Sequence, residues 1–132
     1  MRYNQHKFSS SHLIAWIRVV EVSAQSPELI YDFGGFPDKL YRQVYQPPGA
    51  PELAEKILEA LKTKGVACAA NNNRGLDHGA WCPLKLMYPE ADIPVVQVSL
   101  VKGLDPQLHL KIGEALTPLL ETERNVRNLN HL

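Results

Sequence analysis

Val95-Val96-Gln97-Val98-Ser99-Leu100-Val101 is an almost continuously apolar run that follows Pro94. Strands that are covered on both faces have this composition, so the run predicts a buried strand over 94–101. A helix is predicted next, because Asp105-Pro106 suits a helix start and an apolar stripe then repeats with the helical period. The members of this stripe are Leu108, Ile112, Ala115, Leu116 and Leu119. A strand followed by a helix is the repeating unit of an α/β domain.

The same alternation of strand and helix patterns extends upstream. The helix over 51–64 is the clearest, because Pro51 suits a first helical position, Gly65 suits the end, and one face is apolar. Shorter patterns predict strands over 17–22 and 66–70, and helices over 38–44 and 81–88. We therefore expect one domain over 1–132 of the three-layer α/β class, with a mostly parallel sheet flanked by helices.

Composition and charge limit the classes of function. The 132 residues are 45% apolar, and 14 basic residues balance 14 acidic ones without a long block of either sign. A nucleic-acid or membrane partner is therefore not expected. No apolar run reaches the length of a membrane span, residues 1–11 lack the apolar core of a signal peptide, and two cysteines are too few for a disulfide framework. These patterns predict a soluble, cytoplasmic protein.

His78 is the histidine whose neighbours favour chemistry most, because it stands between Asp77 and Gly79 in a predicted loop. A nearby carboxylate favours the charged imidazole and a glycine allows close backbone approach, so general acid–base work is one interpretation. Asp77 and His78 would equally well cap the helix that begins near Trp81. His109 lies one residue from the apolar stripe of the last predicted helix, which favours a structural role.

Aromatic residues surround a glycine pair in the loop over 31–37. Tyr31, Phe33 and Phe36 would either line a pocket for an aromatic substrate or anchor the loop in the core, and composition leaves both interpretations open. Cys68 and Cys82 have no cationic neighbour in the sequence, which favours inert buried thiols over nucleophiles.

Several ordered motifs resemble the 4,5-DOPA extradiol dioxygenase branch of the class III extradiol ring-cleavage dioxygenases, the LigB-like superfamily. They are PELIYDFGGFP at 27–37, LY at 40–41, PGAPELA at 48–54, RGLDHGAW at 74–81 and PLKLMYPEADIPVVQ at 83–97. The resemblance covers about residues 17–120. Several long motifs in the family's order make chance a poor explanation.

This resemblance implies a metal-dependent ring-opening enzyme. Such enzymes use non-haem iron(II), or zinc in isolated protein, to hold a catechol and dioxygen side by side, and a histidine manages protons as the ring opens. By resemblance, His78 is the catalytic histidine. Tyr31, Phe33 and Asp77 are the candidate substrate-binding residues, and a small-molecule catechol is the expected partner.

The family's metal ligands come from a His-Gly-Ser-Pro-like turn, a Ser-Ala-His-Trp-like strand end and histidines farther downstream. Ser9-Ser10-Ser11-His12 stands near the spacing expected for the second segment, which makes His12 the candidate metal ligand. Arg127-Asn128-Leu129 stands where a His-Asn-Leu segment is expected, and arginine stays protonated and cannot serve as a ligand. The resemblance thus implies a chain shortened at both ends, with one recognised ligand where such iron(II) usually has three.

Two functions stay open on the sequence. The first is an extradiol dioxygenase that cleaves a catechol such as DOPA with Fe(II) or Zn(II), its site completed by oligomerisation. The second is a truncated or degenerate paralogue that binds no metal tightly and acts as an interaction module or an inactive fragment. A homo-oligomer is expected in both cases, because the loss of a first strand exposes a sheet edge that invites pairing.

Overall fold

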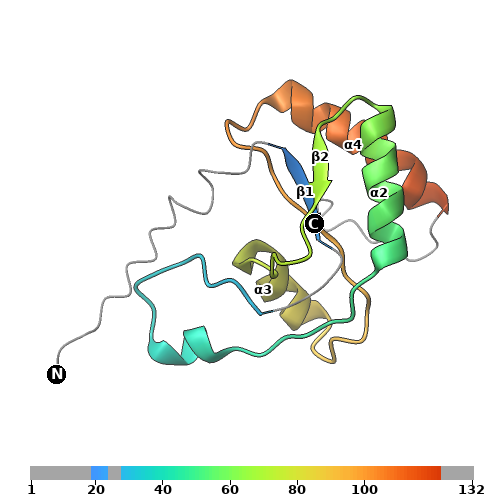
Figure 1. The fold of residues 1–132 in the computed structure, drawn as a ribbon. Coiled ribbons are helices and arrows are strands. Elements are labelled where there is room, and N and C mark those ends of the chain that lie inside the picture. The colour runs from blue at the N-terminus through green and yellow to red at the C-terminus, as the bar shows by residue number, and fades with distance from the viewer. Residues whose placement is uncertain (1–18, 24–27, 123–132) are drawn as a thin grey trace.

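The computed structural model describes residues 19–23 and 28–122 of the chain. Three short strands, three α-helices and one 3-10 helix follow one another in these residues (Figure 1). They are β1 (Val20–Ser23), η1 (Asp38–Arg42), α2 (Pro51–Thr63), β2 (Cys68–Ala70), α3 (His78–Met87), β3 (Gln97–Val98) and α4 (Pro106–Thr122). None of the described helices is long and apolar enough to cross a membrane.

The strands form one sheet in the order β2-β1-β3. Strand β1 runs parallel to β2, with Val20 beside Cys68, and antiparallel to β3, with Val22 beside Val98. The prediction of an α/β fold is confirmed. The sheet of the described residues is small and mixed, whereas a mostly parallel sheet was predicted. The difference arises at β3, which runs antiparallel to its only partner strand in this sheet.

Strand β3 is shorter than the predicted strand over 94–101. Val95 donates its backbone N–H to the carbonyl oxygen of Pro48 at 2.9 Å, so the start of the run pairs with a different segment. At its other end, the hydroxyl oxygen of Ser99 accepts the backbone N–H of Glu21 at 2.9 Å. The backbone N–H of Ser99 donates to the carbonyl oxygen of Glu21 at 2.9 Å, so this pair keeps one backbone bond, and a side chain replaces the carbonyl group in the other.

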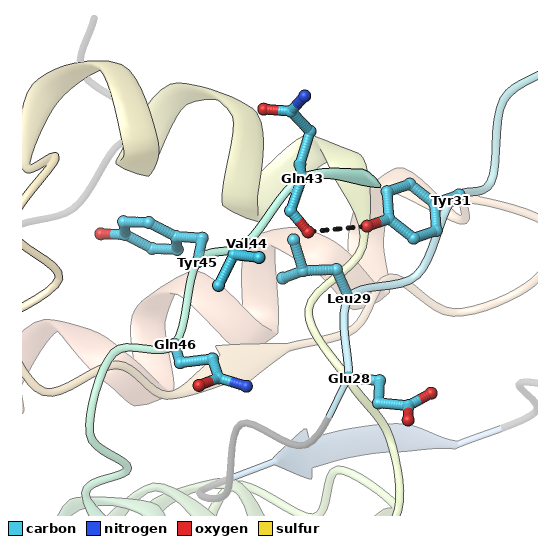
Figure 2. Close-up of a pocket in the computed structure, with 7 residues that line it drawn as sticks. All are labelled: Glu28, Leu29, Tyr31, Gln43, Val44, Tyr45 and Gln46. Atoms are coloured by element: carbon cyan, nitrogen blue, oxygen red, sulfur yellow. Dashed lines mark hydrogen bonds between the residues drawn. The ribbon is translucent and has the colours of Figure 1, made fainter. Parts of the chain in front are cut away.

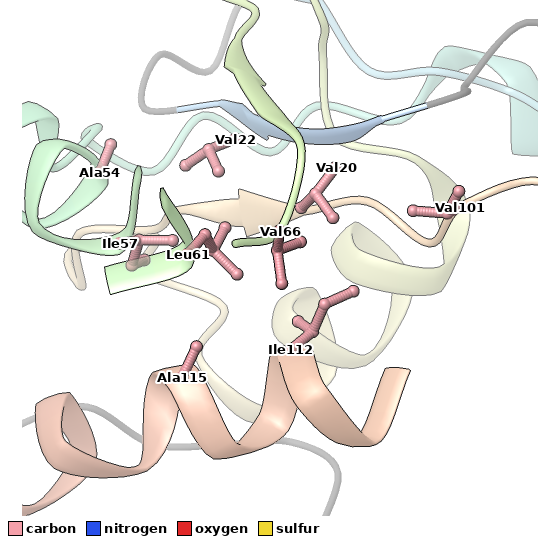
Figure 3. Packing of buried hydrophobic residues seen from close by; sticks show 9 residues of the cluster. All are labelled: Val20, Val22, Ala54, Ile57, Leu61, Val66, Val101, Ile112 and Ala115. Atoms are coloured by element: carbon pink, nitrogen blue, oxygen red, sulfur yellow. The ribbon is translucent and has the colours of Figure 1, made fainter. Parts of the chain in front are cut away.

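The main core lies between the sheet and two helices. Helix α2 packs against β1, β2 and α4, and Figure 1 shows α2 and α4 close together while α3 lies apart. The apolar stripe predicted over 51–64 supplies one side of this core, and Ile112 and Ala115 of α4 supply another (Figure 3). The buried residues are Val20, Val22, Ala54, Ile57, Leu61, Val66, Val101, Ile112 and Ala115.

A second cluster packs around α3 and supports the candidate site. Its buried members are Tyr45, Leu76, Trp81 and Leu84. The indole N–H of Trp81 donates to the carbonyl oxygen of Ile30 at 3.1 Å, and the hydroxyl of Tyr45 donates to the carbonyl oxygen of Tyr88 at 3.1 Å. These bonds satisfy the polar tips of two buried rings. The Trp81 bond fastens the loop that follows residue 28 to α3, and the Tyr45 bond fastens the segment after η1 to the end of α3.

The helix predictions are confirmed for 51–64 and for the helix that Asp105-Pro106 opens, with small shifts at the ends. Helix α3 begins at His78, three residues before the predicted start at Trp81, because Asp77 caps it. The predicted helix over 38–44 is the shorter 3-10 helix η1. Of the predicted strand over 17–22, residues 17 and 18 lie outside the described residues, and β1 covers the rest from Val20.

Replacing Leu61 by alanine should destabilise the protein by about 2–5 kcal/mol, because its side chain is 0% exposed and a cavity would remain between α2 and the sheet. Urea unfolding followed by circular dichroism measures this loss. Lys62→Ala is the matched control, since Lys62 is exposed on the same helix and its loss should change stability little. Equal effects of the two substitutions would contradict the packing described here.

Candidate functional site

His78 and Asp32 form a close pair at the start of α3. The Nδ1 atom of His78 lies 2.7 Å from Oδ1 of Asp32, and the backbone N–H of His78 donates to the same oxygen at 3.0 Å. The His78 side chain is 49% exposed and that of Asp32 is 25% exposed. One carboxylate oxygen therefore holds both the backbone and the ring of a histidine whose outer part faces solvent.

Asp77 fixes the start of α3 and ties it to the sheet. Its Oδ1 accepts the backbone N–H of Ala80 at 3.2 Å, which is the bond of a helix N-cap. Its Oδ2 accepts the side-chain amide of Gln97 at 2.7 Å and lies 3.1 Å from the guanidinium of Arg74. Gln97 in turn accepts the backbone N–H of Asp77 at 3.2 Å. The capping role left open for Asp77 is confirmed, and both carboxylate oxygens are engaged.

Backbone contacts place Asp32 beside His78. The N–H of Ile30 donates to the carbonyl oxygen of Leu76 at 2.8 Å. Gly75 has room for this approach only because it lacks a Cβ atom, which would overlap the carbonyl oxygen of Glu28 and lie 3.0 Å from the carbonyl carbon. The segment after residue 28 therefore runs along residues 74–76, and Asp32 reaches the first residue of α3.

Phe33 is the centre of a cluster of aromatic rings next to His78. The Phe33 ring stacks on Tyr41 at 5.2 Å between centroids and meets the imidazole of His78 edge-to-face at 5.7 Å. Tyr31, Phe36 and Trp81 also contact Phe33. Phe33, a predicted substrate-binding residue, thus lies beside His78. The rings of the loop pack against one another, which fits the interpretation that they anchor the loop. Their role in lining a pocket for an aromatic substrate stays a prediction.

Tyr31 borders a pocket that is separate from the His78–Asp32 pair. Its hydroxyl donates to the carbonyl oxygen of Gln43 at 2.8 Å, which Figure 2 shows as a dashed line. An open pocket of about 220 Å³ lies here. Its lining residues are Glu28, Leu29, Tyr31, Gln43, Val44, Tyr45 and Gln46. Among the predicted site residues that the structure describes, Tyr31 borders this pocket, whereas Phe33, Asp77 and His78 do not.

Asp32 of the pair and the nearby Cys82 have shifted pKa values. Burial raises the pKa of Asp32. The hydrogen bonds from the backbone and ring of His78, a bond from its own backbone and the charge of His78 together outweigh burial, so the pKa lies below the ordinary 3.8. Burial, and then the charge of Asp32, raise the pKa of the Cys82 thiol. Asp32 is therefore ionised at neutral pH, and Cys82 stays protonated, as expected of an inert thiol.

The described residues do not fit a three-ligand metal site. No group of three His, Cys, Asp or Glu side chains within 19–23 and 28–122 is close enough to share an ion. The Nδ1 of His109 lies 2.7 Å from the carbonyl oxygen of Asp105, and its Nε2 accepts the backbone N–H of Val101 at 3.2 Å. His109 thus has the structural role predicted for it. His12, the candidate metal ligand, lies outside the described residues.

Asp32 is the site residue that sequence reasoning missed. It stands 46 residues before His78, between two aromatic residues that were considered. The feature of the sequence that could have indicated Asp32 is its position inside the 27–37 motif, next to Phe33. Gln97 was also missed, although a polar residue inside an apolar strand run requires a hydrogen-bond partner when buried.

A family model described as the catalytic LigB subunit of aromatic ring-opening dioxygenase matches residues 8–129. A 4,5-DOPA dioxygenase extradiol of Beta vulgaris is 50% identical over 104 residues, which are 78% of this chain and 37% of that protein. The protein of the same name from Escherichia coli K12 is 41% identical over 95 residues, 72% of this chain and 35% of its own length. The chain therefore spans about a third of the length of these curated relatives.

A solved structure supports the same assignment. The crystal structure of an uncharacterized protein from Escherichia coli K12 matches with a TM-score of 0.60 and 31% identity, over 79% of this chain and 37% of the other. The chain thus has an α/β fold that it shares with this solved structure. The chain belongs to the LigB family.

Replacing Gly75 by alanine should cost at least about 1–3 kcal/mol of stability, because the new Cβ meets the backbone of Glu28, which cannot yield as a flexible side chain would. The change should also separate Asp32 from His78. Gly34→Ala is the control, since no atom lies within 4 Å of a Cβ built there. Thermal unfolding compares the two variants, and equal stability would show that the two segments do not approach this closely.

Asp32 should stabilise the folded protein at neutral pH and lose this effect in acid. Because its folded pKa lies below 3.8, the stabilisation is present above that pH and falls as the pH drops through the folded value. Asp32→Asn should therefore cost on the order of 1 kcal/mol at pH 7, since the carboxylate is partly screened by solvent, and almost nothing near pH 2. Urea unfolding across this range, with Asp38→Asn as the control, measures it. A constant difference between wild type and Asp32→Asn would contradict the assignment.

Proposed function

We propose that this chain carries the proton-handling part of a site that cleaves the ring of a catechol in the extradiol manner. Membership of the LigB family supports a small aromatic substrate and dioxygenase chemistry. The observation that carries the proposal is the His78–Asp32 pair at an exposed helix start, with the Phe33 ring in a T-shaped contact with the imidazole.

The arrangement suits general acid–base work. The carboxylate of Asp32 is bonded to the Nδ1 atom of His78. Among the described residues, no group forms a hydrogen bond with the Nε2 atom. An unoccupied imidazole nitrogen at a half-exposed position accepts a proton from a catechol hydroxyl and returns it to the ring-opened product. Phe33 offers the ring of a catechol an apolar surface beside the imidazole of His78.

The proposal assigns roles to the acid–base group and the aromatic surface, and it assigns no role in metal binding to the described residues. Family chemistry uses a non-haem iron or zinc ion to orient and polarise catechol and dioxygen. We assign no metal ligand to residues 19–23 and 28–122, because no three of their His, Cys, Asp or Glu side chains form a group that could hold an ion. His12 stays the candidate ligand from the sequence. In the proposal the catechol packs against Phe33 beside His78, and Asp32 is bonded to His78.

A non-catalytic family member is the second candidate. Asp77 has both carboxylate oxygens engaged, and the Tyr31 hydroxyl is bonded to a backbone carbonyl group, as expected for structural residues. On this alternative the motif around His78 holds the loop and α3 together and binds no substrate. Asp77 is the residue whose predicted substrate contact is least compatible with its observed bonds.

A ring-cleavage assay separates the catalytic from the non-catalytic candidate. The protein is loaded anaerobically with iron(II), mixed with DOPA and then exposed to air. Ring cleavage should give a yellow product, and His78→Gln should lower kcat by about 10²–10⁴-fold because it removes the acid–base group. Asp38→Asn, at an exposed position in η1, should leave the rate unchanged. No colour at high protein concentration, or an unchanged rate in His78→Gln, would overturn the proposal and favour the non-catalytic candidate.

A further inference from the structure

We propose that Asp32 is a positioning residue that holds His78 in the tautomer with its hydrogen on Nδ1 and so presents the bare Nε2 atom outward. The catalytic consequence of this arrangement rests on the function proposed above. The tautomer itself is a property of the folded chain and does not depend on turnover.

The hydrogen-bond roles follow from the chemistry of the three groups. The backbone N–H of His78 only donates, so Oδ1 of Asp32 is the acceptor at 3.0 Å. An ionised carboxylate has no hydrogen to give, so the Nδ1 atom at 2.7 Å from the same oxygen must also be a donor. A neutral imidazole carries one hydrogen, and with that hydrogen on Nδ1 the Nε2 atom keeps its lone pair.

The ring is fixed in orientation as well as in tautomer. The backbone bond fixes the Asp32 oxygen relative to the main chain of His78, and the Nδ1 bond then fixes the imidazole relative to that oxygen. Phe33 meets the imidazole edge-to-face with an interplanar angle of 81°. Two neighbouring residues of one loop, Asp32 and Phe33, therefore both contact the imidazole ring.

Asp32 is itself held in place and suits its position. Two residues before it, Ile30 is bonded through its N–H to Leu76 and through its carbonyl oxygen to the indole of Trp81. The carboxylate also lies at the first residue of α3, where the positive end of the helix dipole favours a negative charge. A capping role would need only the backbone bond. The additional bond to the ring is what makes Asp32 a positioning residue for His78.

His109 provides an internal reference for the test. Its Nε2 accepts the N–H of Val101, so its hydrogen lies on Nδ1, which faces the carbonyl oxygen of Asp105. None of these partners contacts Asp32. His109 should therefore show the same tautomer as His78 in the wild-type protein and keep it in every Asp32 variant.

The test is nitrogen-15 NMR of histidine-labelled full chain, which reports which ring nitrogen carries the hydrogen. Wild-type His78 should show a protonated Nδ1 and a bare Nε2. Asp32→Asn, which retains an oxygen acceptor, should keep this tautomer, whereas Asp32→Ala should shift His78 toward the Nε2-protonated form and leave His109 unchanged. An Nε2-protonated His78 in the wild-type protein would overturn the proposal, whether or not any variant folds.

Kinetics of the iron-loaded protein separates this inference from the proposed function. Asp32→Ala should lower kcat by roughly 10²-fold with little change in KM, because the misoriented base still leaves the aromatic surface for the catechol. An unchanged tautomer in a folded Asp32→Ala protein would sink the positioning role even if catechol is cleaved. A shifted tautomer in a protein that cleaves no catechol would support the positioning role while the proposed function fails.

Discussion

The close approach of two backbone segments at Gly75 is the constraint on which the site depends. The absence of a Cβ atom lets residue 75 lie against the carbonyl group of Glu28, and the Ile30–Leu76 hydrogen bond then sets the register of the two segments. With that register, the Trp81 indole bonds to Ile30 and the loop brings its carboxylate and rings to the start of α3. A side chain at residue 75 would separate all of these groups together.

Two packed clusters meet at this site. The main core joins the sheet to α2 and α4, whereas the second cluster joins α3 to the loop after residue 28 and to Tyr45. Gln97 of β3 belongs to the sheet, and its side chain exchanges hydrogen bonds with Asp77 at the cap of α3. The position of the helix start, and with it that of His78, is therefore set by the sheet as well as by the local loop.

The helices were predictable and the sheet pairing was not. Residues 51–63 and 106–122 carry an apolar stripe and a proline at the start, which are local properties of the sequence. Strand pairing depends on the partner, and the apolar run over 94–101 divides between Pro48 and β1, which no local pattern reveals. His78 was found from its motif, but Asp32 was missed because its contact spans 46 residues. His12 lies outside the described residues and stays a prediction.

The central claim is that the surface formed by His78, Asp32 and Phe33 receives a catechol. Titration of the nitrogen-15-labelled protein with a catechol, followed through backbone amide shifts, tests it most directly because it needs neither metal nor turnover. We expect the largest shifts at the amides of residues 32, 33 and 78, with little change in α4. Shifts concentrated in the pocket between Glu28 and Gln46, or no shifts up to the solubility limit, would contradict the claim.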